Sequence, residues 1–101
     1  MREVERALYW IIAGTMGGNN RARIIKELLK NPQNTNQLSK TLELDFKTVQ
    51  HHLKVLEKNK LVIYKGGGGF AKIYFLSQML EDNIDSFNKL LKEIEIKNKK
   101  K

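Results

Sequence analysis

Residues 36–62, NQLSKTLELDFKTVQHHLKVLEKNKLV, decide the fold of this chain. In the first part of this stretch, Leu38 and Leu42 are four positions apart and therefore share one face of a short helix. The segment 43–45 interrupts that helix. Beyond it, apolar residues recur at i, i+4 and i+7, which is typical of a longer amphipathic helix: Val49, Leu53 and Leu56. The pattern predicts two consecutive helices joined by a tight turn.

Both helices carry a capping signal at their start. Thr35 is a candidate N-cap of the first helix and Asp45 of the second, because short polar side chains accept hydrogen bonds from the free N–H groups of a first turn. The second helix is expected to end near Asn59. We therefore predict that it spans residues 46–59.

A β-hairpin is predicted directly after the second helix. The segments 61–64 and 71–76 are rich in β-branched and aromatic residues, and four glycines occupy positions 66–69 between them. A short helix, a tight turn, a longer helix and a hairpin, in this order, make up a winged helix-turn-helix, with residues 61–76 as its wing.

Two further helices are expected before this stretch. One begins after Asn19 or Asn20 and stops at the pair 31–32, Asn-Pro, and it carries its apolar residues on one face: Ala22, Ile25, Leu28 and Leu29. The other covers residues 2–15 and is closed by the glycine pair 17–18. Its apolar residues also recur at helical spacing: Val4, Leu8, Ile11 and Ile12.

A long amphipathic helix is expected over residues 79–96. Its apolar residues step by four, three, four and three, which gives a seam of heptad type: Leu80, Ile84, Phe87, Leu91 and Ile94. The remaining residues, 97–101, are predicted to be a disordered basic tail. The expected fold is thus mainly α with a small β-hairpin, a winged helix-turn-helix core over 20–77 with extra N- and C-terminal helices.

Length and charge limit what this chain can be. Its 101 residues allow one domain, expected over 1–96, and its charge of +8 suits a polyanionic partner. The positive charge is concentrated in residues 20–77, which contain eleven Lys and Arg residues and only four acidic residues. Residues 78–96 contain two lysines and five acidic residues. The chain has no cysteine, and its longest apolar stretch, 8–13, is far shorter than the roughly 20 residues of a membrane helix. We therefore expect a cytoplasmic protein.

The outer face of the helix over 46–59 is the candidate surface for reading DNA. With the apolar stripe turned inward, five polar or basic side chains remain outside near its start: Lys47, Thr48, Gln50, His51 and Lys54. The amide of Gln50 suits adenine, whereas Lys47 and Lys54 suit phosphate or guanine. The alternative interpretation is an ordinary solvated helix face, but a basic body and a wing surround this one.

The wing is a second candidate contact with DNA. Lys65 precedes its glycines and Lys72 follows them, so the hairpin could follow the DNA backbone or enter the minor groove. The alternative is a mobile tip whose glycines only permit the chain to reverse.

Residues 20–77 resemble the ArsR-type winged-helix repressors of bacteria and archaea. The resemblance rests on the segment 48–53, TVQHHL, and on Val55 and Leu56, which match the recognition helix of that family. It implies that Gln50 and His51 face DNA and that His52 packs or caps locally. That family usually has a glycine where this chain has Lys60, and we expect Asn59 to adopt the left-handed conformation instead.

A metal-sensing role is not expected. The metal-sensing members of that family carry cysteine pairs, or His and acidic ligands on the last helix, and this chain has neither. His51 and His52 are adjacent, so they point about 100° apart on a helix and cannot share one ion. We expect no metal, no cofactor and no evident small-molecule effector.

The terminal helices are expected to form a homodimer interface. We assign to it Leu8 and Ile11 from residues 2–15 and the whole seam of residues 79–96: Leu80, Ile84, Phe87, Leu91 and Ile94. A helix of roughly 27 Å is longer than a small body easily covers, and two recognition helices read both halves of a palindrome. The alternative is that the seam packs within its own chain.

These patterns favour a sequence-specific regulator, a repressor, that binds double-stranded DNA as a homodimer. An enzyme is not expected, because no nucleophile with a base, no metal triad and no phosphate-binding loop is evident. The competing function is a winged-helix module that binds proteins of the transcription machinery. Lysines at 47, 54, 65 and 72 favour DNA, since a protein-binding module has no need of them.

Overall fold

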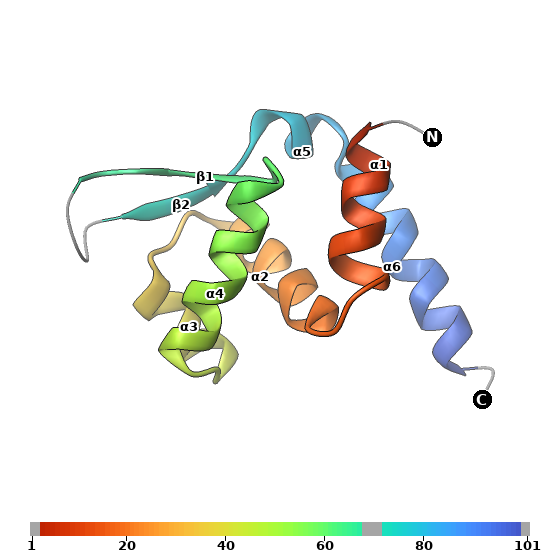
Figure 1. The fold of residues 1–101 in the computed structure, drawn as a ribbon, viewed down its shortest axis with the longest axis horizontal. Helices are drawn as coiled ribbons and strands as arrows, with labels where there is room; N and C mark the ends of the chain where they lie inside the picture. Colours follow the sequence, from red (N-terminus) through yellow and green to blue (C-terminus); the bar gives the residue numbers. More distant parts are fainter. Residues whose placement is uncertain (1–2, 68–71, 100–101) are drawn as a thin grey trace.

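The computed structural model describes residues 3–67 and 72–99, and its fold is mainly α with one small antiparallel hairpin, as the sequence predicts (Figure 1). Its elements, in chain order, are α1 Glu3–Leu8, the π-helix η1 Tyr9–Ala13, α2 Gly18–Lys30, α3 Thr35–Leu42, α4 Phe46–Lys58, β1 Val62–Lys65, β2 Ile73–Leu76, α5 Gln78–Asp82 and α6 Ile84–Lys99. Within the described part of the chain, no helix is both long and apolar enough to cross a membrane.

The two helices of the deciding stretch form as predicted, and α4 matches the expected span of 46–59 to within one residue. Asp45 is its N-cap, with a side-chain oxygen that accepts a hydrogen bond from the backbone N–H of Lys47 at 3.1 Å. The prediction that Thr35 caps α3 is wrong, because Asn34 is the extended residue before it. Asn34 and Gln37 exchange two 2.8 Å hydrogen bonds between side chain and backbone, which makes a capping box.

The exit from α4 differs from the expectation. Lys60 itself adopts the left-handed conformation, with φ of 61°, and Asn59 does not, with φ of −94°. The Asn59 side chain instead donates to the carbonyl of Val55 at 2.8 Å. The left-handed residue has to precede Leu61 directly, because the N–H of Leu61 turns back to the carbonyl of Leu56 at 2.9 Å.

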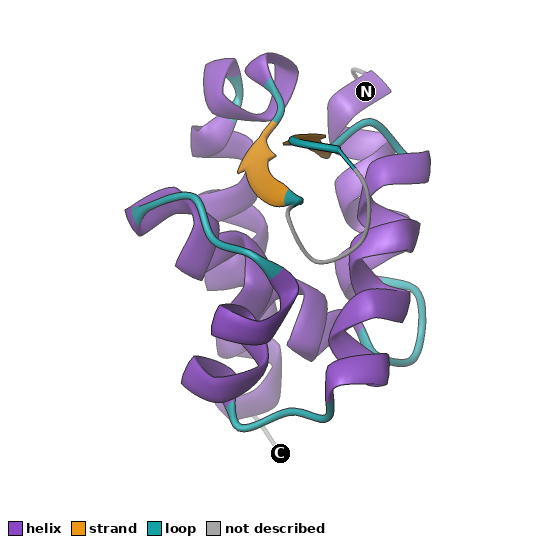
Figure 2. Cartoon of the chain, turned by 90° about the vertical axis from the view of Figure 1, so that its left-hand side faces the viewer, coloured by secondary structure: helices purple, strands orange, loops and turns teal. Residues whose placement is uncertain are grey.

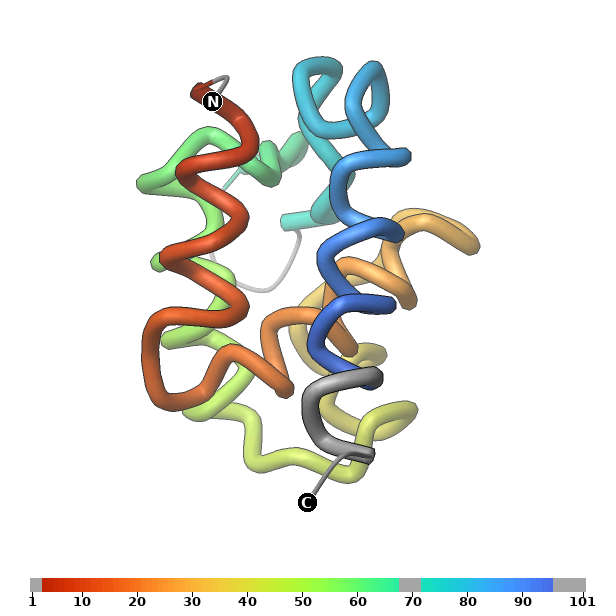
Figure 3. The backbone as a smooth tube through the Cα atoms, turned by 90° about the vertical axis from the view of Figure 1, so that its right-hand side faces the viewer, coloured from red at the N-terminus to blue at the C-terminus, as the bar shows by residue number. Residues whose placement is uncertain are grey.

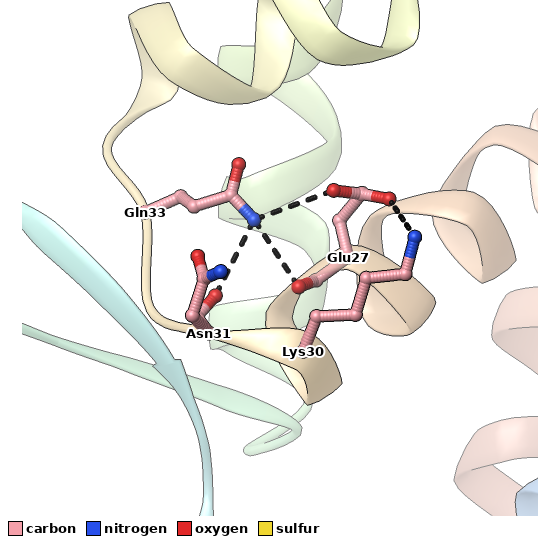
Figure 4. A network of polar contacts seen from close by, with 4 residues as sticks. All are labelled: Glu27, Lys30, Asn31 and Gln33. Atoms are coloured by element: carbon pink, nitrogen blue, oxygen red, sulfur yellow. Dashed lines mark hydrogen bonds and ion pairs between the residues drawn. The ribbon is translucent and has the colours of Figure 1, made fainter.

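The hairpin is anchored to the body by a contact that the sequence did not reveal. Strands β1 and β2 pair from Val62 with Leu76 to Lys65 with Ile73. Gln33, in the connector between α2 and α3, forms an isolated bridge with Tyr74 on the other edge of β2. Figure 4 shows that the side-chain amide of Gln33 also donates to the backbone and carboxylate oxygens of Glu27 and to the carbonyl of Asn31. The connector therefore has a defined path beside the wing.

The N-terminal helix is not a regular α-helix. It changes from α1 into η1, which ends where the N–H of Gly14 reaches the carbonyl of Tyr9 at 2.9 Å. The next helix begins at Gly18 with Gly17 as its N-cap, so the prediction of a cap at Asn19 or Asn20 is wrong. A glycine is required there because a Cβ atom on Gly18 would lie 1.8 Å from the carbonyl oxygen of Ile12.

The predicted C-terminal helix over 79–96 is in fact two helices, α5 and α6, with a break at Asn83. The Asn83 side chain donates to the carbonyl of Met79 at 2.8 Å, and its backbone N–H bonds to Leu80 instead of continuing the α-helical pattern. Helix α6 continues to Lys99, so residues 97–99 are helical and the prediction of a tail from 97 is wrong for them. Residues 100 and 101 lie outside the described residues.

Four of the residues that the sequence assigns to the homodimer interface belong to the core of the protomer. Figure 3 shows α1 and α6 side by side, and residues of the two helices are in contact. Leu8, Ile11, Leu80 and Phe87 are buried, so they have no surface left for a partner. A chain of this size has a small core and needs its terminal helices to complete it. Ile84, Leu91 and Ile94 are half-buried.

Candidate nucleic-acid interface

One end of the molecule is formed by α3, α4 and the hairpin, and Figure 2 views the molecule from this end. Helix α4 turns Val49, His52, Leu53 and Leu56 inward, where all four are buried. Four of the five side chains predicted on its outer face are exposed, namely Lys47, Gln50, His51 and Lys54, while Thr48 is half-buried. The outer face is therefore available to a ligand along the first two turns and beyond.

A shallow groove of about 150 Å³ lies between the start of α3, the outer side of α4 and the base of the wing. It brings together Gln50 and Lys54 from α4 and Lys72 from the wing. The rest of its lining comes from all three elements: Asn34, Thr35, Asn36, Phe46, Glu57 and Tyr74. Side chains far apart in the sequence thus form one surface with polar, basic and aromatic parts.

The two wing lysines do not share that surface. Cross-strand partners point to the same face of a hairpin and successive residues to opposite faces, so Tyr64 and Tyr74 lie on one face and Ile63 and Phe75 on the other. The ammonium of Lys72 lies 4.3 Å from the centre of the Tyr64 ring, whereas that of Lys65 lies 5.4 Å from the centre of the Phe75 ring. Of the glycine run between them, residues 68 and 69 lie outside the described residues.

His52 is a structural residue, as the resemblance implied. Its side chain is 6% exposed, and its Nδ1 lies 3.2 Å from the Nη1 of Arg21. A guanidinium only donates hydrogen bonds, so Nδ1 accepts and the proton of the neutral ring is on Nε2. Among the residues that the structure describes, no group of three His, Asp or Glu side chains could hold a metal ion.

Arg21 is the residue that sequence reasoning missed. Its buried guanidinium donates to the carbonyl of Ile11 at 2.8 Å, to the carbonyl of Met16 at 3.0 Å and to the hydroxyl of Thr15. Together with the contact to His52, these hydrogen bonds connect η1 and the turn that follows it, residues 14–17, to α4. A signal was present, because Arg21 occupies the apolar stripe of α2, four positions before Ile25.

Burial lowers the pKa of His52, and the positive charges of Arg21 and His51 lower it further. The fold therefore favours the neutral form of His52 more than the unfolded chain does, in which the pKa of a histidine is about 6.5. Below that pH the unfolded chain binds more protons than the folded one, so the stability contributed by neutral His52 is lost as the pH falls.

This lowered pKa leads to a pH-dependence prediction. The urea midpoint of the wild type is expected to fall between pH 7.5 and pH 5, and the His52→Gln variant is expected to show a smaller fall. Lys58→Gln, at an exposed position of the same helix, is the control and should retain the pH dependence of the wild type. Equal pH dependence of the wild type and His52→Gln would show that His52 does not titrate as inferred.

The part of the chain that forms most of this interface resembles a known family. Residues 18–64 match the model of the family described as bacterial regulatory protein, arsR family. Residues 18–64 are therefore similar to an ArsR-family domain. The matched segment contains α2, α3, α4 and most of β1, which includes every element that shapes the groove except β2. A search of curated proteins finds no match.

Solved structures confirm the winged helix-turn-helix fold. The homodimeric winged helix-turn-helix DNA-binding domain Mb0332 from Mycobacterium bovis superimposes with a TM-score of 0.68 at 15% identity, covering 91% of this chain and 80% of its own. HlyU from Vibrio cholerae gives 0.65 at 26% identity, over 88% and 97%. A MepR variant from S. aureus bound to an oligodeoxyribonucleotide gives 0.50 at 18% identity, over 100% and 64%. The fold is that of winged helix-turn-helix DNA-binding domains.

Proposed function

We propose that this protein is a sequence-specific repressor that binds double-stranded DNA as a homodimer. In this proposal α4 enters the major groove, and the wing lies on the backbone or in the minor groove. Residues 20–77 read DNA, the terminal helices hold the two protomers together, and the protein acts in the cytoplasm. The observation that carries the proposal is the groove in which Gln50 of α4 lies with two lysines, Lys54 and Lys72.

The chemistry of that groove suits a duplex. The major groove is about 12 Å wide and admits a helix whose outer side chains are polar or basic. Gln50 supplies the amide that pairs with an adenine edge, and Lys54 and Lys72 supply positive charge for the phosphates on either side. Lys47 and His51 extend the same exposed face of α4, and Thr48 borders it. Lys65, on the other face of the wing, would contact a phosphate away from the groove.

The end of the molecule opposite the groove supports the homodimer. Tyr9 and Trp10 on η1 are 51% and 62% exposed, so this end carries apolar surface that a partner would remove from water. Ile84, Leu91 and Ile94 of α6 remain candidates for the same interface, and the similar Mb0332 domain is homodimeric. A second copy placed there would present two α4 helices to half-sites about 34 Å apart. The mass of the protein in solution tests this part of the proposal.

Binding to random-sequence duplex DNA at two salt concentrations tests the proposed function itself. A protein that contacts phosphates releases counterions, so the affinity should fall steeply as salt rises. Affinity that does not respond to salt would reject DNA as the ligand and favour a module that binds other proteins.

Two substitutions in the groove should have different effects. Lys54→Ala is expected to weaken binding to all duplexes alike and to reduce the slope of log affinity against log salt by about 0.9, because one phosphate contact is lost. Gln50→Ala is expected to cost about 1–3 kcal/mol on the preferred duplex and to relax selectivity at one base position.

The control for this pair is Lys92→Ala, which removes an exposed lysine from α6 at the opposite end of the molecule. This variant should retain the selectivity of the wild type. Its slope of log affinity against log salt should change by less than the roughly 0.9 expected for one phosphate contact. Full affinity and selectivity in both groove variants would mean that α4 does not read DNA.

A further inference from the structure

Phe46 is an aromatic residue that the core does not use. It is the first residue of α4, its side chain is 46% exposed, and it is not among the buried residues of the core. An exposed aromatic ring carries a large apolar area, and most of the outer face of α4 around it is polar or basic. The ring is therefore available for contact with a ligand of the protein.

The other residues that line the groove with Phe46 are mainly polar or basic. Phe46, Gln50 and Lys54 are spaced four positions apart on α4, and all three line the same groove. Lys72 faces them from the wing, and the one acid in the described lining, Glu57, lies about three turns further along α4 than Phe46. The carboxylate of the neighbouring Asp45 accepts a hydrogen bond from the N–H of Lys47 as the N-cap. A ligand that combines negative charge with an apolar group therefore suits the lysines and the exposed ring of this groove.

A DNA duplex offers one apolar group in its major groove, the 5-methyl group of thymine. Residues four apart on a helix are separated by about 6 Å along its axis, and successive base pairs by about 3.4 Å. A base pair contacted by Phe46 is therefore one or two steps from the pair read by Gln50. Apolar side chains, phenylalanine among them, are suited to this contact.

We propose that Phe46 reads thymine by contacting its 5-methyl group, one or two base pairs from the position read by Gln50. This inference rests on the proposed function, since it assumes that α4 lies in the major groove. It assigns a specificity-determining role to a residue that both the polar pattern of α4 and the family resemblance leave out.

Replacing thymine by uracil tests this inference, because uracil lacks the methyl group and retains the hydrogen-bonding groups. Duplexes selected by the wild type from a random pool are made with uracil at each thymine in turn. At one position, one or two steps from the Gln50 site, uracil is expected to weaken wild-type binding about fourfold, the value of burying one methyl group. Phe46→Ala is expected to bind the two duplexes with equal affinity.

Two further variants separate this effect from a general loss of affinity. Phe46→Leu retains an apolar side chain and should retain part of the preference for thymine. Leu29→Ala removes a similarly exposed apolar side chain, 49% exposed, from α2 and should leave the fourfold preference intact. The inference is overturned if the wild type does not distinguish thymine from uracil, or if Phe46→Ala still does. Salt-dependent binding without a uracil effect would reject this inference alone, whereas no binding to any duplex would reject the proposed function with it.

Discussion

Gly18→Ala is expected to destabilise the fold by about 3 kcal/mol, at the upper end for an overpacked site. The added Cβ would lie 1.8 Å from the carbonyl oxygen of Ile12 and 2.6 Å from its carbonyl carbon. Both are backbone atoms, so no side-chain rotation relieves the clash. The α2 helix would have to move away from η1, where Ile11 and Ile12 are both buried.

Thermal unfolding measures this effect directly. A loss of about 3 kcal/mol should lower the Tm of a chain of this size by roughly 15 °C. Gly67→Ala is the matched control, because a Cβ at Gly67 has no atom within 4 Å, and its Tm should stay close to that of the wild type. An unchanged Tm for Gly18→Ala would show that η1 and α2 do not approach as closely as described.

Arg21→Met is expected to destabilise the fold by about 2–4 kcal/mol. The substitution removes the Arg21 donor from the Nδ1 of His52 and from the carbonyl of Ile11, which retains only a long 3.5 Å hydrogen bond from the Thr15 hydroxyl among its side-chain donors. An unsatisfied buried group costs about 1–3 kcal/mol. Removing a buried charge also recovers the cost of its desolvation, which reduces the net loss. We expect the lost hydrogen bonds to dominate, because the one guanidinium has partners on η1, the following turn and α4.

The control for Arg21→Met is Lys26→Met, which removes an exposed charge from the same helix and should be close to neutral. A second readout is specific to the contact with His52. Because Arg21 lowers the pKa of His52, the NMR titration of His52 should move to higher pH in Arg21→Met. A variant as stable as the wild type, with an unshifted His52 titration, would contradict the role given to Arg21.

The parts of the interface that depend on local signals were predictable. The i, i+4, i+7 stripe placed α4, and Asp45 caps it as expected, because periodicity and capping act over one or two turns of chain. By elimination, the same stripe identifies four exposed residues of α4, whereas the fifth predicted residue, Thr48, is half-buried. It does not identify Phe46, because a polar pattern does not mark an apolar side chain as a candidate contact.

The arrangement of the wing could not be predicted from local sequence patterns. Composition predicted two strands, but only their register shows that Lys72 joins the groove and that Lys65 lies on the opposite face. A shift of one residue in the pairing would exchange the two faces. The bridge from Gln33 to Tyr74 likewise joins segments about forty residues apart, and no local pattern specifies it.

By itself, the sequence determined the order of the elements, the helix that presents its polar face and the concentration of positive charge in residues 20–77. Only the tertiary structure decided that Leu80 and Phe87 lie inside the protomer, that Arg21 is buried against His52 and that α2 begins at Gly18. The physical reason is that periodicity shows which face of a helix is apolar, but not whether the same chain or a second copy covers it. Burial and close approach depend on contacts between distant segments, and these exist only once the chain has folded.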